Sequence, residues 1–153
     1  MWNERQKVAT GPIYMFMSDD FLFTSQDWDK EVLSEFDKYE DKIVLLAVDN
    51  GPMWEKYGFS GIGFVHKNWV DAVGYLFPNY FYPNCADKWV NDLAVMINRR
   101  VKLTMGCVDV GKRDVIHMGK SRLVSSWRKI YYTEPFIVQR AKDANKLLEV
   151  MKQ

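Results

Sequence analysis

The order of apolar segments predicts an α/β fold, with a mixed, mainly parallel sheet flanked by helices. Three observations favour this class. Short apolar runs of strand length alternate with longer segments of helical periodicity. Hydrophobic residues make up 48% and charged residues 27% of the 153 residues, which is typical of a folded globular chain. No repeat or low-complexity tract divides the sequence, so we expect a single domain over residues 1–153.

The first half of the chain predicts strands on either side of one helix. The run "PIYMFM" (12–17) has the length of a strand, and "FLF" (21–23) continues it after an acidic pair. Residues 24–42 carry apolar side chains at helical spacing. The run "KIVLLAV" (42–48) is apolar throughout, which predicts a strand that is buried on both faces.

The second half continues the alternation of strands and helices. The expected elements are a strand at "GIGFV" (61–65), a short helix at 67–76, the clearest helix at 86–100, a strand near 101–105, an irregular segment at 106–122 and a C-terminal amphipathic helix at 133–153. Because helices link successive strands, we expect neighbouring strands to be mainly parallel.

Charge and cysteine content exclude several classes of protein. The net charge of +1 creates no global field that would select nucleic acid or a membrane as partner. Cys85 and Cys107 form no C-x-x-C motif, so neither a zinc ribbon nor a disulfide framework is predicted. The N-terminus lacks an apolar leader, and the apolar runs are far shorter than a membrane span. We therefore expect a soluble, cytoplasmic protein without a membrane span.

Asp19 and Asp20 follow the first predicted strand directly. Carboxylates at the end of a buried strand lose hydration and repel each other, and a divalent cation offsets both effects. Mn²⁺ and Mg²⁺ prefer carboxylate oxygens and often contact substrate phosphates at the same time. The pair therefore predicts a metal and diphosphate site. The other interpretation is an acidic turn that caps the next segment, and a double Asp alone leaves both open.

Two further segments carry a family resemblance. Gly63–Pro78 reads "GFVHKNWVDAVGYLFP", and Ala86–Asp92 reads "ADKWVND". Together with the acidic pair, they make residues 11–120 similar to the metal-dependent GT-A glycosyltransferases, in particular the short family 2-like enzymes of bacteria and phages. The resemblance implies a hexosyltransferase-like enzyme that transfers a sugar from a nucleotide-sugar donor to a hydroxyl acceptor such as a carbohydrate.

The resemblance also implies roles for single residues. Asp20 matches the last acidic slot of the metal-binding D-x-D motif, with Asp19 assisting, and both would contact Mn²⁺ or Mg²⁺ and the donor diphosphate. Ser18 occupies the first slot, where this sequence departs from the motif. Asp87 matches the general base of inverting members. His117 falls near the position of a late metal ligand, in a shortened pattern.

Each of these residues also has a structural interpretation. Asp87 could lie in the first turn of its helix, where the macrodipole favours its charge. Asp92 is one turn from Lys88, so we expect a surface ion pair. His66 has the position of a polar residue at a strand end. The aromatic side chains of the Gly-Pro loop could form an acceptor-side lid or buried anchors for that loop; they are Trp54, Tyr57 and Phe59.

The resemblance leaves out one part of the family's domain. GT-A enzymes hold the nucleotide base in a half that precedes the acidic motif, whereas here only residues 1–10 and one strand precede Asp19. We therefore expect the C-terminal portion of a glycosyltransferase-like domain, completed by a missing N-terminal half or by a second chain. The alternative is a non-catalytic module that binds a carbohydrate or a partner. Without the N-terminal half, the sheet edge at 12–17 would be open to pairing with another chain.

Overall fold

The computed structural model describes residues 2–19, 21–49, 51, 54–55, 58–80, 85–109 and 129–153. The elements that position the site, in chain order, are α1 (Trp2–Val8), β1 (Ile13–Phe16), β2 (Phe21–Phe23), α2 (Trp28–Asp37), β3 (Leu45–Val48), β4 (Gly63–His66), α4 (Lys67–Val73), α5 (Ala86–Met96), β5 (Arg100–Leu103), β6 (Cys107–Asp109) and α8 (Glu134–Val150). The chain is of the expected α/β class, but its elements do not alternate one by one: β1 and β2, β3 and β4, α4 and α5, and β5 and β6 follow each other directly in this order.

Four strands form the main sheet, in the order β1-β4-β3-β5. The expectation of a mixed sheet is confirmed, but the expectation that it is mainly parallel is wrong. Strand β4 is antiparallel to both β1 and β3, and only β3 and β5 are parallel. The chain returns directly from β3 into β4, whereas the parallel neighbours β3 and β5 are separated by α4 and α5. Strands β1, β3 and β5 therefore run in the same direction.

A second, two-stranded sheet contains β2 and β6. The expectation that residues 21–23 continue the first strand is therefore wrong, and the segment at 107–109, expected to be irregular, is a strand. The chain leaves the main sheet after β1 and pairs with the segment that follows β5. This crossing brings Gly106 against Thr24, where an added Cβ would lie 2.4 Å from the Thr24 Oγ1. Only glycine fits this approach.

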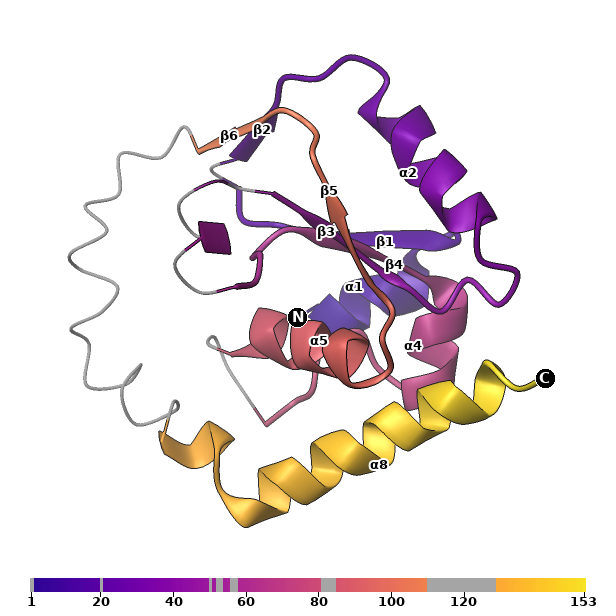
Figure 1. Ribbon diagram of the computed structural model, residues 1–153, viewed down its shortest axis with the longest axis vertical. Coiled ribbons are helices and arrows are strands. Elements are labelled where there is room, and N and C mark those ends of the chain that lie inside the picture. Colours follow the sequence, from indigo (N-terminus) through magenta and orange to yellow (C-terminus); the bar gives the residue numbers. More distant parts are fainter. Residues whose placement is uncertain are drawn as a thin grey trace.

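The main sheet lies between two layers (Figure 1). Helix α2 and the small sheet cover one face, and α4, α5 and α8 cover the other. Side chains of β3 alternate between the two cores: Leu45 and Ala47 face α5, while Leu46 and Val48 face α2. All four residues of this strand are buried, as its unbroken apolar sequence predicts.

Helix α8 packs against α4 and α5 with a face that its apolar residues only partly predict. The buried residues are Arg140, Asp143, Ala144 and Leu147. Ile137, expected on the packed stripe, is 51% exposed. The buried polar groups have partners, since the Arg140 guanidinium donates to the Tyr131 carbonyl at 2.9 Å. Hydrophobicity alone cannot locate such a face.

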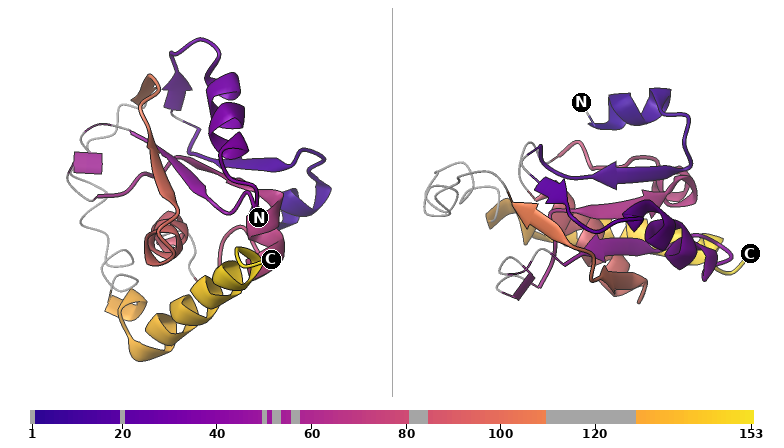
Figure 2. Two further views of the ribbon diagram at one scale, coloured as in Figure 1. Left: turned by 45° about the vertical axis from the view of Figure 1, so that its right-hand side comes forward. Right: turned by 90° about the horizontal axis from the view of Figure 1, so that it is seen from above.

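Strand β1 is an edge of the main sheet. In the right-hand view of Figure 2, α1 lies outside β1, on the side away from β4. Asn3 attaches α1 to the fold, because its side chain accepts from the Leu76 and Phe77 N–H groups at 3.1 and 3.0 Å. A groove of about 240 Å³ separates α1 from β1, lined by Arg5, Gln6, Ala9, Ile13, Met15 and Leu76.

Candidate functional site

The carboxyl ends of β1, β3 and β5 meet at one end of the main sheet, because these strands run in the same direction. Such ends are the usual ligand-binding position in open α/β sheets. Asp19 follows β1 there, Asp49 follows β3, and Gly61 precedes β4 at the same end. The first turn of α5 brings Asp87 to Gly61: a Cβ added at Gly61 would lie 3.7 Å from the Asp87 Oδ2.

Asp87 is half-buried and poorly partnered for a carboxylate. Its Oδ1 accepts the Lys88 backbone N–H at 2.8 Å. The backbone N–H of Asp87 itself also bonds to the carboxylate, and the Oδ2 lies near Gly61. Burial raises the pKa of Asp87 above its ordinary value, and the Lys88 backbone N–H offsets only part of this. A desolvated carboxylate with a raised pKa, held by backbone N–H groups, could serve as a general base.

Asp49 has the opposite electrostatic environment. The Lys102 ammonium lies 2.7 Å from its Oδ2, and the Gly51 N–H donates to its Oδ1 at 3.0 Å. The hydrogen bond with Lys102 is the larger cause, and together these groups lower the pKa of Asp49. Two carboxylates at one end of the sheet therefore differ in proton affinity, which is typical of sites that separate acid–base roles.

Arg100 joins α5 to the segment that covers it. One guanidinium nitrogen donates to the Gly58 carbonyl at 2.7 Å and to the Asn91 Oδ1 at 3.0 Å. Asn91 is one turn after Asp87, so both side chains lie on the same side of α5. The segment that leads to Gly61 is thereby held next to this side of the helix.

The interpretation of Asp92 as an ion-pair residue is confirmed, but the pair is not confined to the surface. Lys88 lies 2.8 Å from the Asp92 carboxylate, and both side chains are about one-quarter exposed. The Tyr131 hydroxyl also donates to Asp92, at 2.7 Å. Burial and this bond raise the pKa of Tyr131. Asp92 therefore joins α5 to the segment that leads into α8.

His66 ends β4, as expected of a polar residue at a strand end, and it also caps α4. Its Nδ1 accepts the Asn68 backbone N–H at 3.1 Å. Trp54 is half-buried and packs against the core between β3 and the helices. Of the two interpretations of this aromatic residue, its packing favours an anchor for the loop. Tyr57 lies outside the described residues.

The expected metal ligands are only partly placed. Asp19 is exposed, so the loss of hydration predicted for it does not occur. Asp20 and His117 lie outside the described residues. Among the residues that the structure does describe, no group of three or more His, Cys, Asp or Glu side chains could hold a metal ion. Of the expected site residues, the structure therefore describes Asp87 and Asp19 only.

Sequence reasoning singled out Asp87 but not Asp49 or Arg100. Asp49 directly follows a fully buried strand, the same signal that drew attention to Asp19, and could have been found by it. Arg100 had no such signal, because its role depends on the loop that folds back toward α5. Its selection required the structure.

Comparisons with known proteins assign no family to this chain. In the described part of the structure, no helix has both the length and the apolar character needed to cross a membrane. No protein-family model matches the sequence, and neither a curated protein nor a solved structure matches it.

Proposed function

We propose that this chain carries the acceptor side of a glycosyltransferase, which transfers a sugar from a nucleotide-sugar donor to an acceptor hydroxyl. The observation that carries the proposal is Asp87, a half-buried carboxylate with a raised pKa at the carboxyl end of the sheet, where its Oδ2 lies against a glycine, Gly61. The similarity of residues 63–78 and 86–92 to GT-A enzymes is the reason for proposing sugar transfer as the reaction. The position and environment of Asp87 support its role independently of that similarity.

Asp87 acts as the general base. The acceptor hydroxyl binds at the Oδ2, on the side where Gly61 has no side chain. As the acceptor oxygen bonds to the anomeric carbon, the bond from that carbon to the diphosphate oxygen breaks, and the hydroxyl proton moves to Asp87. The Lys88 N–H remains bound to the Oδ1 and holds the carboxylate in orientation.

The divalent metal expected from the sequence is Mn²⁺ or Mg²⁺. Asp19 offers an exposed carboxylate at the end of β1, and Asp20 and His117 would complete its protein ligands. Mg²⁺ commonly binds one or two carboxylates together with substrate phosphates, so this donor set suits a metal that arrives with the nucleotide. When bound, the metal supplies positive charge to the diphosphate leaving group.

The donor nucleotide requires a further binding half, and β1 offers the place for it. The Pro12 carbonyl bonds toward β4, accepting the Lys67 N–H at 2.6 Å. Backbone direction alternates along a strand, so the N–H and C=O groups of Ile13 and Met15 face the open edge. A strand of the nucleotide-binding half can pair there by displacing α1, which lies outside β1. Co-expression of such a half should give a complex that purifies together.

The test is sugar transfer by the wild type and by Asp87→Asn, each fused to or co-expressed with a nucleotide-binding half. We expect the substitution to lower the transfer rate about 10²–10⁴-fold, the usual contribution of a positioned base. Binding of Mn²⁺ with a nucleoside diphosphate, measured by calorimetry, should be unchanged. An equal transfer rate would remove Asp87 from the mechanism. A folded complex that binds sugars but transfers none would favour the alternative, a non-catalytic carbohydrate-binding module.

A further inference from the structure

Two cations on β5 share one aromatic partner. Arg100 and Lys102 are two residues apart on a strand, so their side chains leave the same face of the sheet. Val101 and Leu103 pack into the opposite core, which places the two cations on the side of α5. The Arg100 guanidinium carbon lies 5.1 Å and the Lys102 ammonium 5.2 Å from the centre of the Trp54 ring.

The charges of the two cations are balanced differently. Lys102 is paired with the Asp49 carboxylate at 2.7 Å. Arg100 donates only to neutral acceptors, the Gly58 carbonyl and the Asn91 amide oxygen, and both bonds come from the same guanidinium nitrogen. Among the described residues, no carboxylate pairs with Arg100. A guanidinium has five N–H donors, so most of this fork remains available to an anion.

This guanidinium lies on the acceptor side of the proposed reaction. It bonds to Asn91, which is one helical turn, about 5.4 Å along the axis, from Asp87. Asp19 lies at the other edge of the sheet, and the three strand spacings from β1 to β5 amount to about 14 Å. A group bound by Arg100 is therefore closer to the general base than to the expected metal.

We infer that Arg100 and Trp54 form a subsite for an anionic group, a phosphate or a carboxylate, on the acceptor. The inference rests on the proposed function for the identity of the acceptor, but anion binding can be measured without it. The planar guanidinium binds either anion through two parallel hydrogen bonds, and stacking on Trp54 holds it in one orientation. The acceptor hydroxyl then lies one helical turn away, at Asp87.

The experiment titrates the full chain with inorganic phosphate and, separately, with acetate, in the absence of metal and nucleotide. Nuclear magnetic resonance follows the Arg100 Nε–H and the Trp54 indole N–H. We expect saturable shifts of both signals with at least one anion, and the preferred anion names the acceptor group. Arg100→Gln, which can still donate to Gly58 and Asn91, should weaken binding about ten-fold or more. Arg100→Lys keeps the charge but not the planar guanidinium, and its anion affinity should lie between those of the wild type and Arg100→Gln.

The neighbouring arginine provides the matched control. Arg99 is already paired with Asp41 at 3.0 Å and lies 4.9 Å from the centre of the Tyr39 ring. Arg99→Gln changes the net charge equally and should leave anion binding within about two-fold of wild type. Equal weakening by both Gln variants would mean general charge attraction and would overturn the inference, as would the absence of saturation.

The two proposals fail in different ways. Asp87→Asn should bind the anion as tightly as the wild type, because the subsite does not include Asp87. Anion binding without sugar transfer would contradict only the proposed function. Transfer to neutral acceptors at the same rate as to anionic ones would contradict only the subsite.

Discussion

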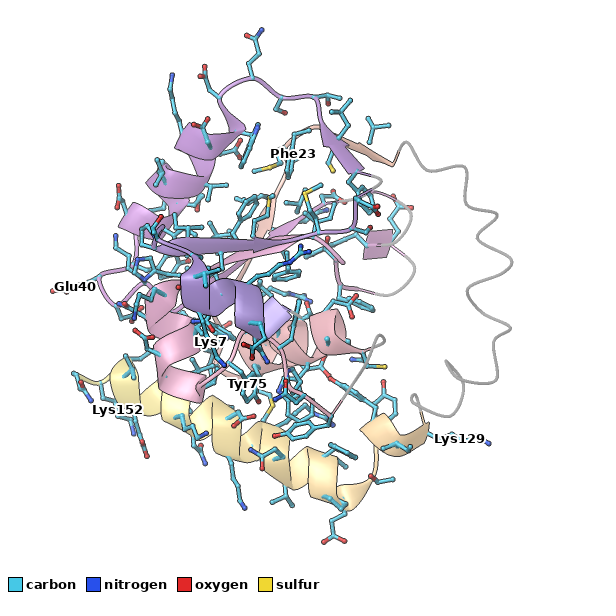
Figure 3. The ribbon with its side chains drawn as sticks, turned by 180° about the vertical axis from the view of Figure 1, so that it is seen from behind. Lys7, Phe23, Glu40, Tyr75, Lys129 and Lys152 are labelled. Atoms are coloured by element: carbon cyan, nitrogen blue, oxygen red, sulfur yellow. The ribbon has the colours of Figure 1, made fainter. Side chains whose placement is uncertain are left out.

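Asp143 in α8 and Asp87 in α5 are both shielded from water, but they differ in the hydrogen-bond donors that surround each carboxylate. Asp143 is fully buried and accepts from the Tyr75 hydroxyl, from the Gln139 amide at 3.1 Å and from the Lys146 ammonium at 3.4 Å. Tyr75, labelled in Figure 3, lies beside α8, so this carboxylate joins α8 to the end of α4. Among the described residues, Asp87 has only backbone donors, the N–H groups of Lys88 and of Asp87 itself.

The difference separates a carboxylate with several side-chain donors from one held by backbone N–H groups. Buried polar groups in native proteins are nearly always hydrogen-bonded, because an unsatisfied group costs about 1–3 kcal/mol. Asp143 follows this rule and contributes to the packing of α8. Asp87, at the carboxyl end of the sheet, accepts only backbone N–H groups among the described residues, those of Lys88 and of Asp87 itself. Stability and pH measurements on the two residues can therefore test this difference.

The largest effect is expected at Asp143. Asp143→Ala removes the acceptor of the buried Tyr75 hydroxyl and leaves the Lys146 charge without its partner. A buried donor left without an acceptor typically lowers the free energy of unfolding by about 1–3 kcal/mol, and Asp143 accepts from both Tyr75 and Gln139, so we expect a loss of about 3 kcal/mol. The Lys146 side chain is 47% exposed and adds little. Urea unfolding followed by circular dichroism measures the change. Asp87→Ala, the matched substitution on α5, should lose less than about 1 kcal/mol. Equal losses would show that the two carboxylates do not differ in role.

Tyr75→Phe isolates one bond of the same cluster. The substitution keeps the ring in the core and removes the hydroxyl that donates to Asp143. Hydrogen bonds to charged groups contribute about 1.5–3 kcal/mol, so we expect a loss in this range. In a double-mutant cycle, Tyr75→Phe should add little to Asp143→Ala, since each removes the same contact. Full additivity would contradict a direct bond between the two side chains.

The sequence predicted the elements of the fold better than their pairing. Apolar periodicity located the helices at α2, α4, α5 and α8, and the unbroken run at 42–48 predicted a strand covered on both faces. The direction of β4 and the separate β2–β6 sheet depend on how loops return, and periodicity contains no such information. Helix α1 was not predicted, because "WNERQKV" has no apolar stripe.

The candidate site, like the fold, was predictable where local sequence decides and not where tertiary contacts decide. Asp87 could be chosen from a local motif at the start of a helix. Its environment depends on Gly61, which is 26 positions earlier and reaches Asp87 only through the tertiary fold. Likewise, the environment of Asp143 depends on Tyr75, which lies 68 positions away in sequence.

Asp87→Asn should stabilise the fold at neutral pH, on the order of 1 kcal/mol, because it replaces a desolvated charge with a neutral amide. The Asn oxygen can still accept the Lys88 N–H. Burial raises the pKa of Asp87, so the folded state binds the proton more tightly than the unfolded state. Wild-type stability therefore falls as pH rises above the ordinary carboxyl pKa of 3.8. The advantage of Asn should be greatest at pH 7 and vanish below about pH 4. A destabilised Asn variant would indicate that Asp87 only supports the helix terminus.

The smallest effect is expected at His66, a titratable residue that belongs with Asp143 on the structural side of the comparison. Its neutral Nδ1 caps α4, and burial lowers the pKa of His66 below its ordinary value of 6.5. The unfolded state therefore binds the proton more readily, and the stabilisation by the cap is complete above pH 6.5 and declines as pH falls below it.

His66→Asn retains a side-chain acceptor that does not titrate. We expect this variant to match the wild type at pH 8 and to be more stable at pH 5, by roughly 0.5–1 kcal/mol, the contribution of a helix cap. His66→Ala should lose a similar amount at pH 8 and little at pH 5. Thermal unfolding at both pH values gives the comparison, and the other histidine, His117, is present in all three proteins, so its titration cancels. If the three proteins showed the same pH dependence, the cap would contribute nothing, and His66 would leave the structural group.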